Sequence, residues 1–279
     1  MNPATAKSEI VITPGAEGMG GHVKALWQSR HLVYWLMRRD ILLRYRQTRF
    51  GLFWVVLQPA VMFSVYLVSL GYFARLPAPA GVPYALYLLT GLVPWLFFQS
   101  VVMATSSALQ QNMHLITKVY FPRLVLVASA VASASFDYLW MLLILLVVAF
   151  VHGMVELSSL PVILGWSVVI LTLATATGMG VAALSVYYRD LAIALPVLLQ
   201  VVFFLSPVVY AVTMVPEHYL FWYYLNPVAT LVESVRSAFG LSSHAGLFHQ
   251  LLAIGTAAFS AVAALFLFSR VERAVVDLA

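Results

Sequence analysis

Residues 124–151 read LVLVASAVASASFDYLWMLLILLVVAFV, an almost unbroken run of apolar side chains. A helix of about 20 apolar residues crosses roughly 30 Å of hydrocarbon. In lipid, only helices and closed barrels satisfy all their backbone hydrogen bonds. This stretch therefore predicts a membrane-spanning helix in an all-α protein.

The composition of the whole chain supports a membrane protein. Of its 279 residues, 63% are hydrophobic and 9% are charged, whereas ordinary globular domains carry about 25% charged residues. Charge this sparse cannot cover a water-facing surface, which excludes soluble enzymes, nucleic-acid-binding domains and disordered chains. The absence of cysteine excludes disulfides and cysteine-ligated metals.

Five further apolar runs have a similar length, so we predict six spanning helices. Their ranges are 52–73, 84–106, 124–151, 161–186, 194–214 and 247–269. The third and fourth exceed the minimum length, which predicts tilt or helical ends outside the bilayer. Residues 51–270 would form one transmembrane domain, followed by a cytoplasmic C-terminus at 271–279.

Prolines and small residues indicate how these helices pack. Kinks are predicted at four prolines, where they serve either packing or a lined pathway: Pro59, Pro94, Pro196 and Pro207. Close helix contacts are predicted where small residues recur at every fourth position: Ala174, Gly178 and Ala182, and Ala176 with Gly180.

Lysine and arginine decide the orientation. Six spans place both termini on one side, and the side richer in Lys and Arg faces the cytosol. Of the 15 basic residues, only Arg75 and Arg236 fall in segments assigned to the outside. We therefore predict a multi-pass membrane protein with both termini in the cytoplasm. Residues 1–21 hold no apolar signal segment and predict a flexible cytoplasmic tail.

Residues 22–50 predict an interfacial amphipathic helix, because apolar side chains alternate with arginines. This helix is either an anchor that sets topology or a collar for an anionic lipid head group, and both roles are compatible. The arginines of the collar are Arg38, Arg39, Arg44, Arg46 and Arg49.

Motifs for catalysis are missing from the sequence. It contains no G-x-x-x-x-G-K-[ST] phosphate loop, no H-E-x-x-H and no G-x-S-x-G, and its seven histidines lack ligand spacing. We expect no catalytic residue, no metal site and no cofactor bound by this chain. The chain is not expected to hydrolyse ATP alone, so energy would have to come from elsewhere.

Asp137 is the ionisable residue nearest the middle of a predicted span, which makes it a candidate functional group. Ser129 and Ser133 precede it at helical spacing. We favour an interhelical hydrogen bond over a proton relay because no cation lies in another span.

Two more segments are candidates for a transport pathway. In the first span, four side chains within an arc of about 80° either face the bundle or line a channel: Gln58, Met62, Tyr66 and Ser69. Between the fifth and sixth spans, Asn226 and Pro227 divide an apolar segment that is too short to cross twice. It predicts a re-entrant helical hairpin, with aromatic residues that form an interfacial belt or stack on sugars.

The loop at 107–123 predicts a short amphipathic helix in the cytosol, ended by Phe121 and Pro122. An apolar stripe in this position rests on the membrane or docks into a groove of a partner. A partner would also supply the missing energy.

Several motifs together resemble the permease subunits of bacterial ABC exporters of surface polysaccharides, the type-2 family that includes the O-antigen (Wzm) and teichoic-acid (TagG) permeases. The matching stretches run in family order: Arg44-Tyr45-Arg46-Gln47-Thr48, Gln58-Pro59, Gly91-Leu92-Val93-Pro94-Trp95, Lys118-Val119-Tyr120-Phe121-Pro122-Arg123, Tyr188-Arg189-Asp190, Ser206-Pro207-Val208, and Asn226-Pro227 followed by Arg236.

The resemblance implies a homodimer that binds two P-loop nucleotide-binding subunits, which carry the ATP and Mg²⁺. Such an assembly lies in the bacterial inner membrane and exports an undecaprenyl-pyrophosphate-linked glycan of the O-antigen type. Contacts with the ATPase subunit are implied for Gln110, Asn112, His114, Lys118, Tyr120 and Arg123, and for Tyr188, Arg189 and Asp190. The arginines at 38–49 are implied to meet the pyrophosphate. An exit gate is implied at Tyr219, Trp222, Tyr223, Asn226, Pro227 and Arg236.

Other substrates and functions remain open at this point. A type-2 exporter of a capsule, teichoic acid, drug or lipid would share the architecture. A membrane-embedded enzyme would need a pair of acidic groups, and the acidic residues here are dispersed. A scaffold would not need helices that contact an ATPase.

Overall fold

The computed structural model describes residues 25–45, 51–78, 81–119, 121–154, 156–188, 190–241 and 245–278. Within these ranges all regular structure is helical and no strand occurs. The predicted all-α class is therefore confirmed. The predicted tail at 1–21 lies outside the described residues.

Five helices of the described chain are long and apolar enough to cross a membrane. The first combines α3 (Trp54–Tyr66) with the π-helix η2 (Leu67–Phe73), after a short 3₁₀ turn η1 (Gly51–Phe53). The others are α4 (Tyr84–Gln111), α6 (Leu124–Val151), α7 (Leu160–Ser185) and α11 (Leu247–Leu278), of which residues Leu247–Arg270 form the apolar part. Their bounds agree with the predicted spans, except that α4 continues beyond 106 to Gln111.

The predicted fifth span is shorter than expected. Helix α8 (Asp190–Phe204) has 15 residues, or about 22 Å at 1.5 Å per residue, whereas we predicted a span over 194–214. The helix stops because Pro207 disfavours a helical conformation at Ser206, and turns follow instead. The structure thus has five helices of spanning length and one shorter apolar helix in the predicted fifth position.

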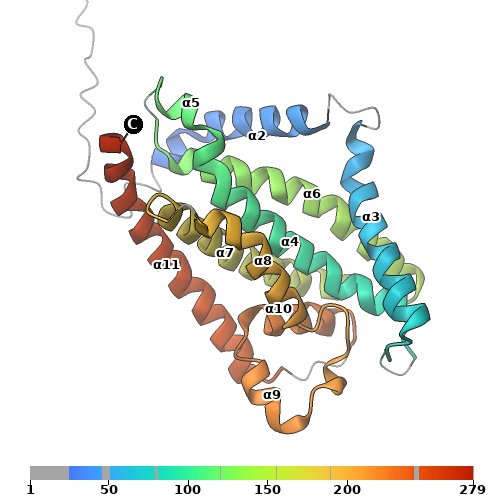
Figure 1. Cartoon of the computed structure of the whole chain (residues 1–279). Coiled ribbons are helices and arrows are strands. Elements are labelled where there is room, and N and C mark those ends of the chain that lie inside the picture. Colours follow the sequence, from blue (N-terminus) through green and yellow to red (C-terminus); the bar gives the residue numbers. More distant parts are fainter. Residues whose placement is uncertain are drawn as a thin grey trace, which may run out of the picture.

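Helix α4 is the centre of the molecule. It packs between α6 and α7, and α10 (Pro227–Ala238) also contacts it (Figure 1). In the most apolar 18-residue stretch of α4, 72% of the residues are buried. In the corresponding stretch of the first span, Trp54–Phe73, the share is 6%. Helix α3 therefore leaves most of its surface uncovered in a single copy of the chain.

Small residues bring α4 and α7 together as the sequence predicts. A Cβ atom at Gly178 of α7 would overlap the hydroxyl of Thr105 in α4. Ala174 and Ala182 are buried on the same stripe. In the second predicted stripe Ala176 is buried, but Gly180 faces open space.

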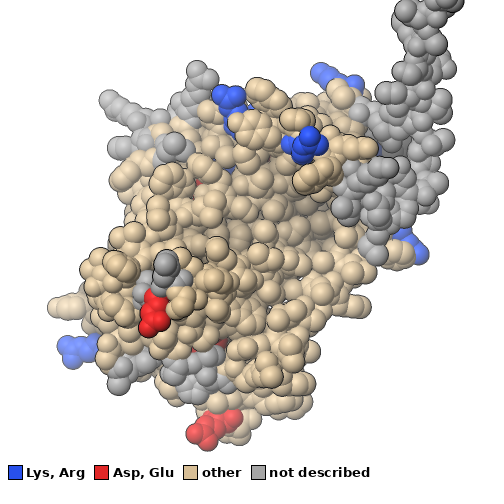
Figure 2. All heavy atoms as spheres, turned by 180° about the vertical axis from the view of Figure 1, so that it is seen from behind, with Lys and Arg blue, Asp and Glu red and all other residues tan. Residues whose placement is uncertain are grey.

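The two ends of the bundle differ. Helix α2 (Arg30–Tyr45) lies across one end beside α5 (Met113–Ile116), while α9 (Glu217–Tyr223) lies at the other end, near the short 3₁₀ turn η4 (Val212–Met214) (Figure 1). The remaining 3₁₀ turn, η3 (Leu157–Ser159), precedes α7. Figure 2 shows a broad band without charged side chains across one face, with Lys and Arg mainly toward the end that carries α2.

Candidate functional site

Helix α2 is fastened to the end of α4 by one arginine. Arg39 Nη2 donates to Asn112 Oδ1 at 2.6 Å and to Asp40 Oδ1 at 2.8 Å. Asn112 is the residue between α4 and α5, and its own amide group donates to the Ala108 carbonyl at 2.9 Å. Helix α2 is thus connected directly to the turn that leads into α5.

A second attachment joins the last turn of α2 to the middle of α6. Arg44 Nη1 donates to Asp137 Oδ2 at 2.6 Å, and the Tyr45 hydroxyl donates to Asp137 Oδ1 at 2.9 Å. The Asp137 side chain is 15% exposed, whereas that of Arg44 is 48% exposed. Asp137 therefore has the kind of hydrogen bond between helices that we favoured from the sequence.

The environment of Tyr45 keeps its phenol protonated. Burial, followed by the negative charge of Asp137, raises the pKa of Tyr45 to about 12. A phenol with this pKa keeps its proton at physiological pH. Tyr45 and Arg44 therefore both donate hydrogen bonds to Asp137. Sequence reasoning missed both partners, because they lie 93 and 92 residues away along the chain on a helix outside the spans.

The remaining arginines of the predicted collar have different places. Arg38 lies 5.4 Å from the ring centroid of Trp35, in a cation–π contact on the exposed side of α2. Arg39 and Arg44 point inward to the contacts above. Arg46 and Arg49 lie outside the described residues.

The predicted cytoplasmic helix over 107–123 is divided in the structure. Its first residues extend α4, Asn112 interrupts the helix, and α5 has only four residues. Leu115 and Ile116 pack against the core cluster that contains Leu36 of α2. The polar residues Gln110, His114 and Lys118 are exposed, while Arg123 is half-buried before α6. Tyr120 lies outside the described residues.

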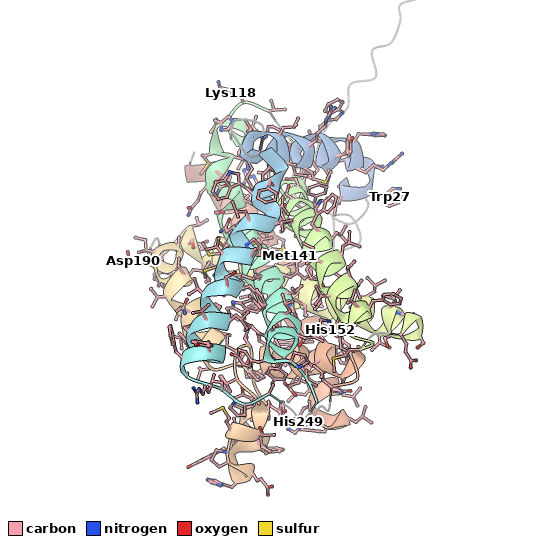
Figure 3. The ribbon with its side chains drawn as sticks, turned by 90° about the vertical axis from the view of Figure 1, so that its right-hand side faces the viewer. Trp27, Lys118, Met141, His152, Asp190 and His249 are labelled. Carbon is pink, nitrogen blue, oxygen red and sulfur yellow. The ribbon has the colours of Figure 1, made fainter. Side chains whose placement is uncertain are left out.

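The second predicted contact with a partner is the turn from α7 to α8. Tyr188 is 65% exposed and Asp190 begins α8, while Arg189 lies outside the described residues. Figure 3 shows Lys118 at the end of the molecule and Asp190 further down, near the level of Met141. Asp190 is at the N-terminus of α8, where a carboxylate suits the helix dipole.

Beneath α2, between α4 and α6, lies a cavity of about 300 Å³ that is partly open to the surroundings. Its polar lining includes Asp40, Arg44, Ser107, Asn112 and Ser133. The Ser133 hydroxyl is buried and has no hydrogen-bond partner within the described ranges. Sequence reasoning placed Ser133 on a polar stripe but gave no sign of a cavity.

At the opposite end lies Arg236, which is the most deeply buried charged residue among those described, with 1% exposure. Its guanidinium donates to the carbonyls of Pro207 and Val208, in the turn after α8. It also donates to Glu233 Oε1 at 2.8 Å, which forms a buried ion pair along α10. Arg236 therefore connects α10 to the turn that ends α8.

Helix α4 completes the surroundings of Arg236. The guanidinium carbon lies 3.9 Å from the centroid of the Tyr87 ring, and Nη2 is 3.4 Å from the Tyr87 carbonyl. Gly91 makes this approach possible, because a Cβ atom there would overlap the guanidinium and the Val208 carbonyl. The sequence offered one signal, the i, i+3 spacing of Glu233 and Arg236, and none for Gly91.

Asn226 and Pro227 separate α9 from α10. The Asn226 side chain accepts a hydrogen bond from the Val228 backbone amide at 3.0 Å, which caps α10, and donates to the Ser206 hydroxyl at 3.0 Å. The Tyr223 hydroxyl is 3.0 Å from that of Tyr210. Tyr219 and Trp222 are 56% and 68% exposed. Two helices of the predicted hairpin are thus present, and only α9 presents aromatic side chains to the surroundings.

The predicted stripe on the first span is largely uncovered in a single chain. Gln58, Met62 and Ser69 are exposed on α3 and η2, and the Tyr66 ring packs against Phe203 of α8 at 5.4 Å between centroids. Within the described part of the chain, no group of His, Asp and Glu side chains is arranged to hold a metal ion.

Comparison with known proteins gives consistent similarities. Residues 31–239 match the family described as ABC-2 type transporter. The chain is 30% identical over 221 residues to the O-antigen export system permease protein RfbA of Myxococcus xanthus, which covers 78% of this chain and 83% of that protein. It is 27% identical over 210 residues to the protein of the same name from Klebsiella pneumoniae, and this match covers 73% of this chain and 78% of that protein. It is also 27% identical over 207 residues to the polysialic acid transport protein KpsM of Escherichia coli, and this match covers 73% of this chain and 79% of that protein.

Proposed function

The chain belongs to the ABC-2 type transporter family, and from this premise we propose that it is the transmembrane subunit of an ATP-driven exporter of a bacterial surface polysaccharide. The observation that carries the proposal is its similarity, over about three quarters of the chain, to permeases named for O-antigen export and polysialic acid transport. The chain has no phosphate-binding loop, so ATP hydrolysis belongs to a separate nucleotide-binding subunit.

The working assembly that we propose is a homodimer with two nucleotide-binding subunits in the bacterial inner membrane. Six segments of each copy cross the bilayer, with α8 and the turns after it as the fifth, and both termini lie in the cytoplasm. The uncovered surface of α3 supports a dimer, because a second copy would bury it. Gln58, Met62 and Tyr66 would then line a channel between the copies.

Transport begins at the cytoplasmic end. The exposed residues beside α5, together with Tyr188, Arg189 and Asp190, contact the nucleotide-binding subunits. The hydrogen bond from Arg39 to Asn112 connects that region to α2. A movement of α5 on ATP binding would therefore also move α2. The exposed Arg38 of α2, with Arg46 and Arg49 of the segment after it, attracts the pyrophosphate of an undecaprenyl-linked, O-antigen-type glycan, whereas Arg39 and Arg44 already pair with Asp40 and Asp137.

Transport ends at α9 and α10, which we propose to be a re-entrant exit gate. Arg236 holds α10 against α4 and against the end of α8, so separation of the two α8 helices would move α10. Exposed Tyr219 and Trp222 offer sliding contacts to sugar rings. A capsular glycan is the second candidate substrate, supported by the similarity to the polysialic acid transport protein.

The experiment that tests this function is purification of the tagged protein in mild detergent, with identification of co-purifying proteins and an assay of ATP hydrolysis. We expect a stoichiometric P-loop subunit. Replacement of Tyr120 or Arg189 by alanine should uncouple ATP hydrolysis from export, whereas His152→Ala, distant from α5 in Figure 3, should not. Absence of an ATPase partner would contradict the proposal, and unchanged export in both variants would contradict the assigned contacts.

A further inference from the structure

The cavity beneath α2 shares only Arg44 with the arginine collar and has no residue of the stripe on α3 in its lining. Helix α2 forms its roof, α4 provides Ser100, Ser107 and Gln111, and α6 provides Ser133. At roughly 30 Å³ for each water, its volume of about 300 Å³ equals about ten waters. This is room for one sugar ring.

The charged groups of the cavity are already neutralised. Asp40 is paired with Arg39 at 2.8 Å, and Arg44 is paired with Asp137 at 2.6 Å. A ligand that carries a net charge would have to break one of these pairs, and both its charge and the abandoned partner would be left partly desolvated. The cavity therefore suits a neutral ligand.

The uncharged groups of the cavity mainly accept hydrogen bonds. The Ser100 and Ser107 hydroxyls donate their protons to the backbone carbonyls of Phe97 and Met103, at 3.0 and 2.9 Å. The Gln111 amide nitrogen donates to Ser107 Oγ at 3.0 Å, which leaves the Gln111 carbonyl oxygen to accept. A phosphate oxygen cannot donate to these acceptors, whereas a sugar hydroxyl both donates and accepts.

Ser133 supplies the independent sign of a polar ligand. Its residue is 2% exposed, and its hydroxyl has no hydrogen-bond partner in the part of the chain that the structure describes. A buried hydroxyl without a partner is unfavourable. One turn earlier on α6, Ser129 satisfies its hydroxyl by donating to the Leu126 carbonyl at 2.9 Å.

We propose that this cavity binds one neutral sugar ring of the substrate, the ring next to the lipid pyrophosphate, at the cytoplasmic end of the transport path. This inference rests on the proposed export of a lipid-linked glycan and adds a sugar-reading site to it. Ser100, Ser107 and Gln111 accept from its hydroxyls, and Ser133 donates to the ring once its side chain rotates from the buried wall into the cavity. Gln111 and Asn112 lead directly into α5. A sugar bound in the cavity would therefore shift α5, the helix that we propose to contact the ATPase subunit.

Two probes and three variants test this site in the purified complex with its ATPase partner in nanodiscs. The probes are undecaprenyl pyrophosphate that carries one neutral hexose and undecaprenyl pyrophosphate alone. We expect the wild type to bind the first about tenfold more tightly, with a correspondingly larger stimulation of ATP hydrolysis. Ser133→Ala should lower this ratio about fivefold, since it removes one hydrogen bond. Ala104→Leu, which fills the cavity, should abolish the preference, and Ser129→Ala should keep it.

Because the wild-type Ser133 hydroxyl has no partner among the described residues, Ser133→Ala should not lower the melting temperature, which separates a lost ligand contact from misfolding. Equal binding of both probes to the wild type, or an unchanged ratio in Ser133→Ala and Ala104→Leu, would overturn the sugar site and leave the exporter function intact. Release of a bound phospholipid by the cavity variants, without a change in the ratio, would also overturn it. Failure of both probes to bind the complex would overturn the lipid-linked substrate together with the site.

Discussion

The guanidinium of Arg236 lies against the backbone of Gly91, so closely that a methyl group on Gly91 would overlap it. This contact joins α10 to α4 at the end of the bundle opposite to α2. The same arginine donates to the carbonyls of Pro207 and Val208. One side chain thus holds three segments that are far apart in the sequence.

Gly91→Ala should destabilise the protein. The added methyl has no room beside Arg236 and the Val208 carbonyl, and overpacking of this kind costs about 1–3 kcal/mol. Thermal unfolding in detergent measures the effect. Gly180→Ala is the matched control, because a Cβ there meets open space and alanine favours a helix over glycine by up to about 1 kcal/mol. Equal melting temperatures for the two variants would contradict the close approach.

Arg236→Lys should also destabilise the protein and disturb export. Lysine cannot reproduce the planar fork that reaches Glu233 and two carbonyls at once. Arg236→Met leaves Glu233 as a buried unpaired charge, at a cost of about 3–5 kcal/mol. The double variant Arg236→Met with Glu233→Leu should recover part of that loss, and thermal unfolding compares the two. A double variant that is less stable than Arg236→Met would rule out the ion pair as the cause.

The pair of Arg44 and Asp137 should show coupling in a double-mutant cycle. Because Arg44 is about half exposed, solvent screening limits the coupling energy to about 1 kcal/mol or less. Asp137→Asn and Arg44→Gln, singly and together, give this energy from thermal unfolding. Arg38→Gln serves as a control because Arg38 contacts Trp35 on the other side of α2. A coupling as large between Arg38 and Asp137 would show that the effect is not specific to the pair.

The pKa of Tyr45 predicts a transition in alkaline solution. Its folded value of about 12 lies above the ordinary value of about 10, so protonated Tyr45 favours the folded state. This contribution is complete below about pH 10 and is lost as the pH rises to about 12. The phenolate absorbance of the wild type, minus that of Tyr45→Phe, should show a midpoint near pH 12. A midpoint near pH 10 would mean that Tyr45 is not held against Asp137.

The boundaries of the spans illustrate what could be predicted. The range 124–151 agrees with α6 at both ends, because Pro122 and the end of the apolar run mark its limits. At α8 the prediction was too long: a window of apolar residues continues past Phe204, but Pro207 ends the helix. Hydropathy does not distinguish a helix from apolar turns that are buried by neighbours.

The candidate site could be predicted only in part. Interfacial arginines, Asp137 and the hairpin at Asn226 all stand out in the sequence, because charge, prolines and apolar runs are local properties. The partners of these residues do not stand out. Glu233 and Arg236 occupy one helix and could be paired by spacing, whereas Tyr87 and Gly91 come from a helix about 150 residues away.

By itself, the sequence determined that this chain spans a membrane as a helical bundle, because free backbone groups are costly in lipid and apolar runs of about 20 residues fit spanning helices rather than the shorter strands of a barrel. It also determined which residues carry charge at the ends of the spans. Only the tertiary structure decided that Arg44 meets Asp137, that Arg236 meets Gly91 and that Ser133 faces a cavity. These contacts depend on how the helices pack, and the same apolar surfaces could pack in many ways without changing the sequence pattern.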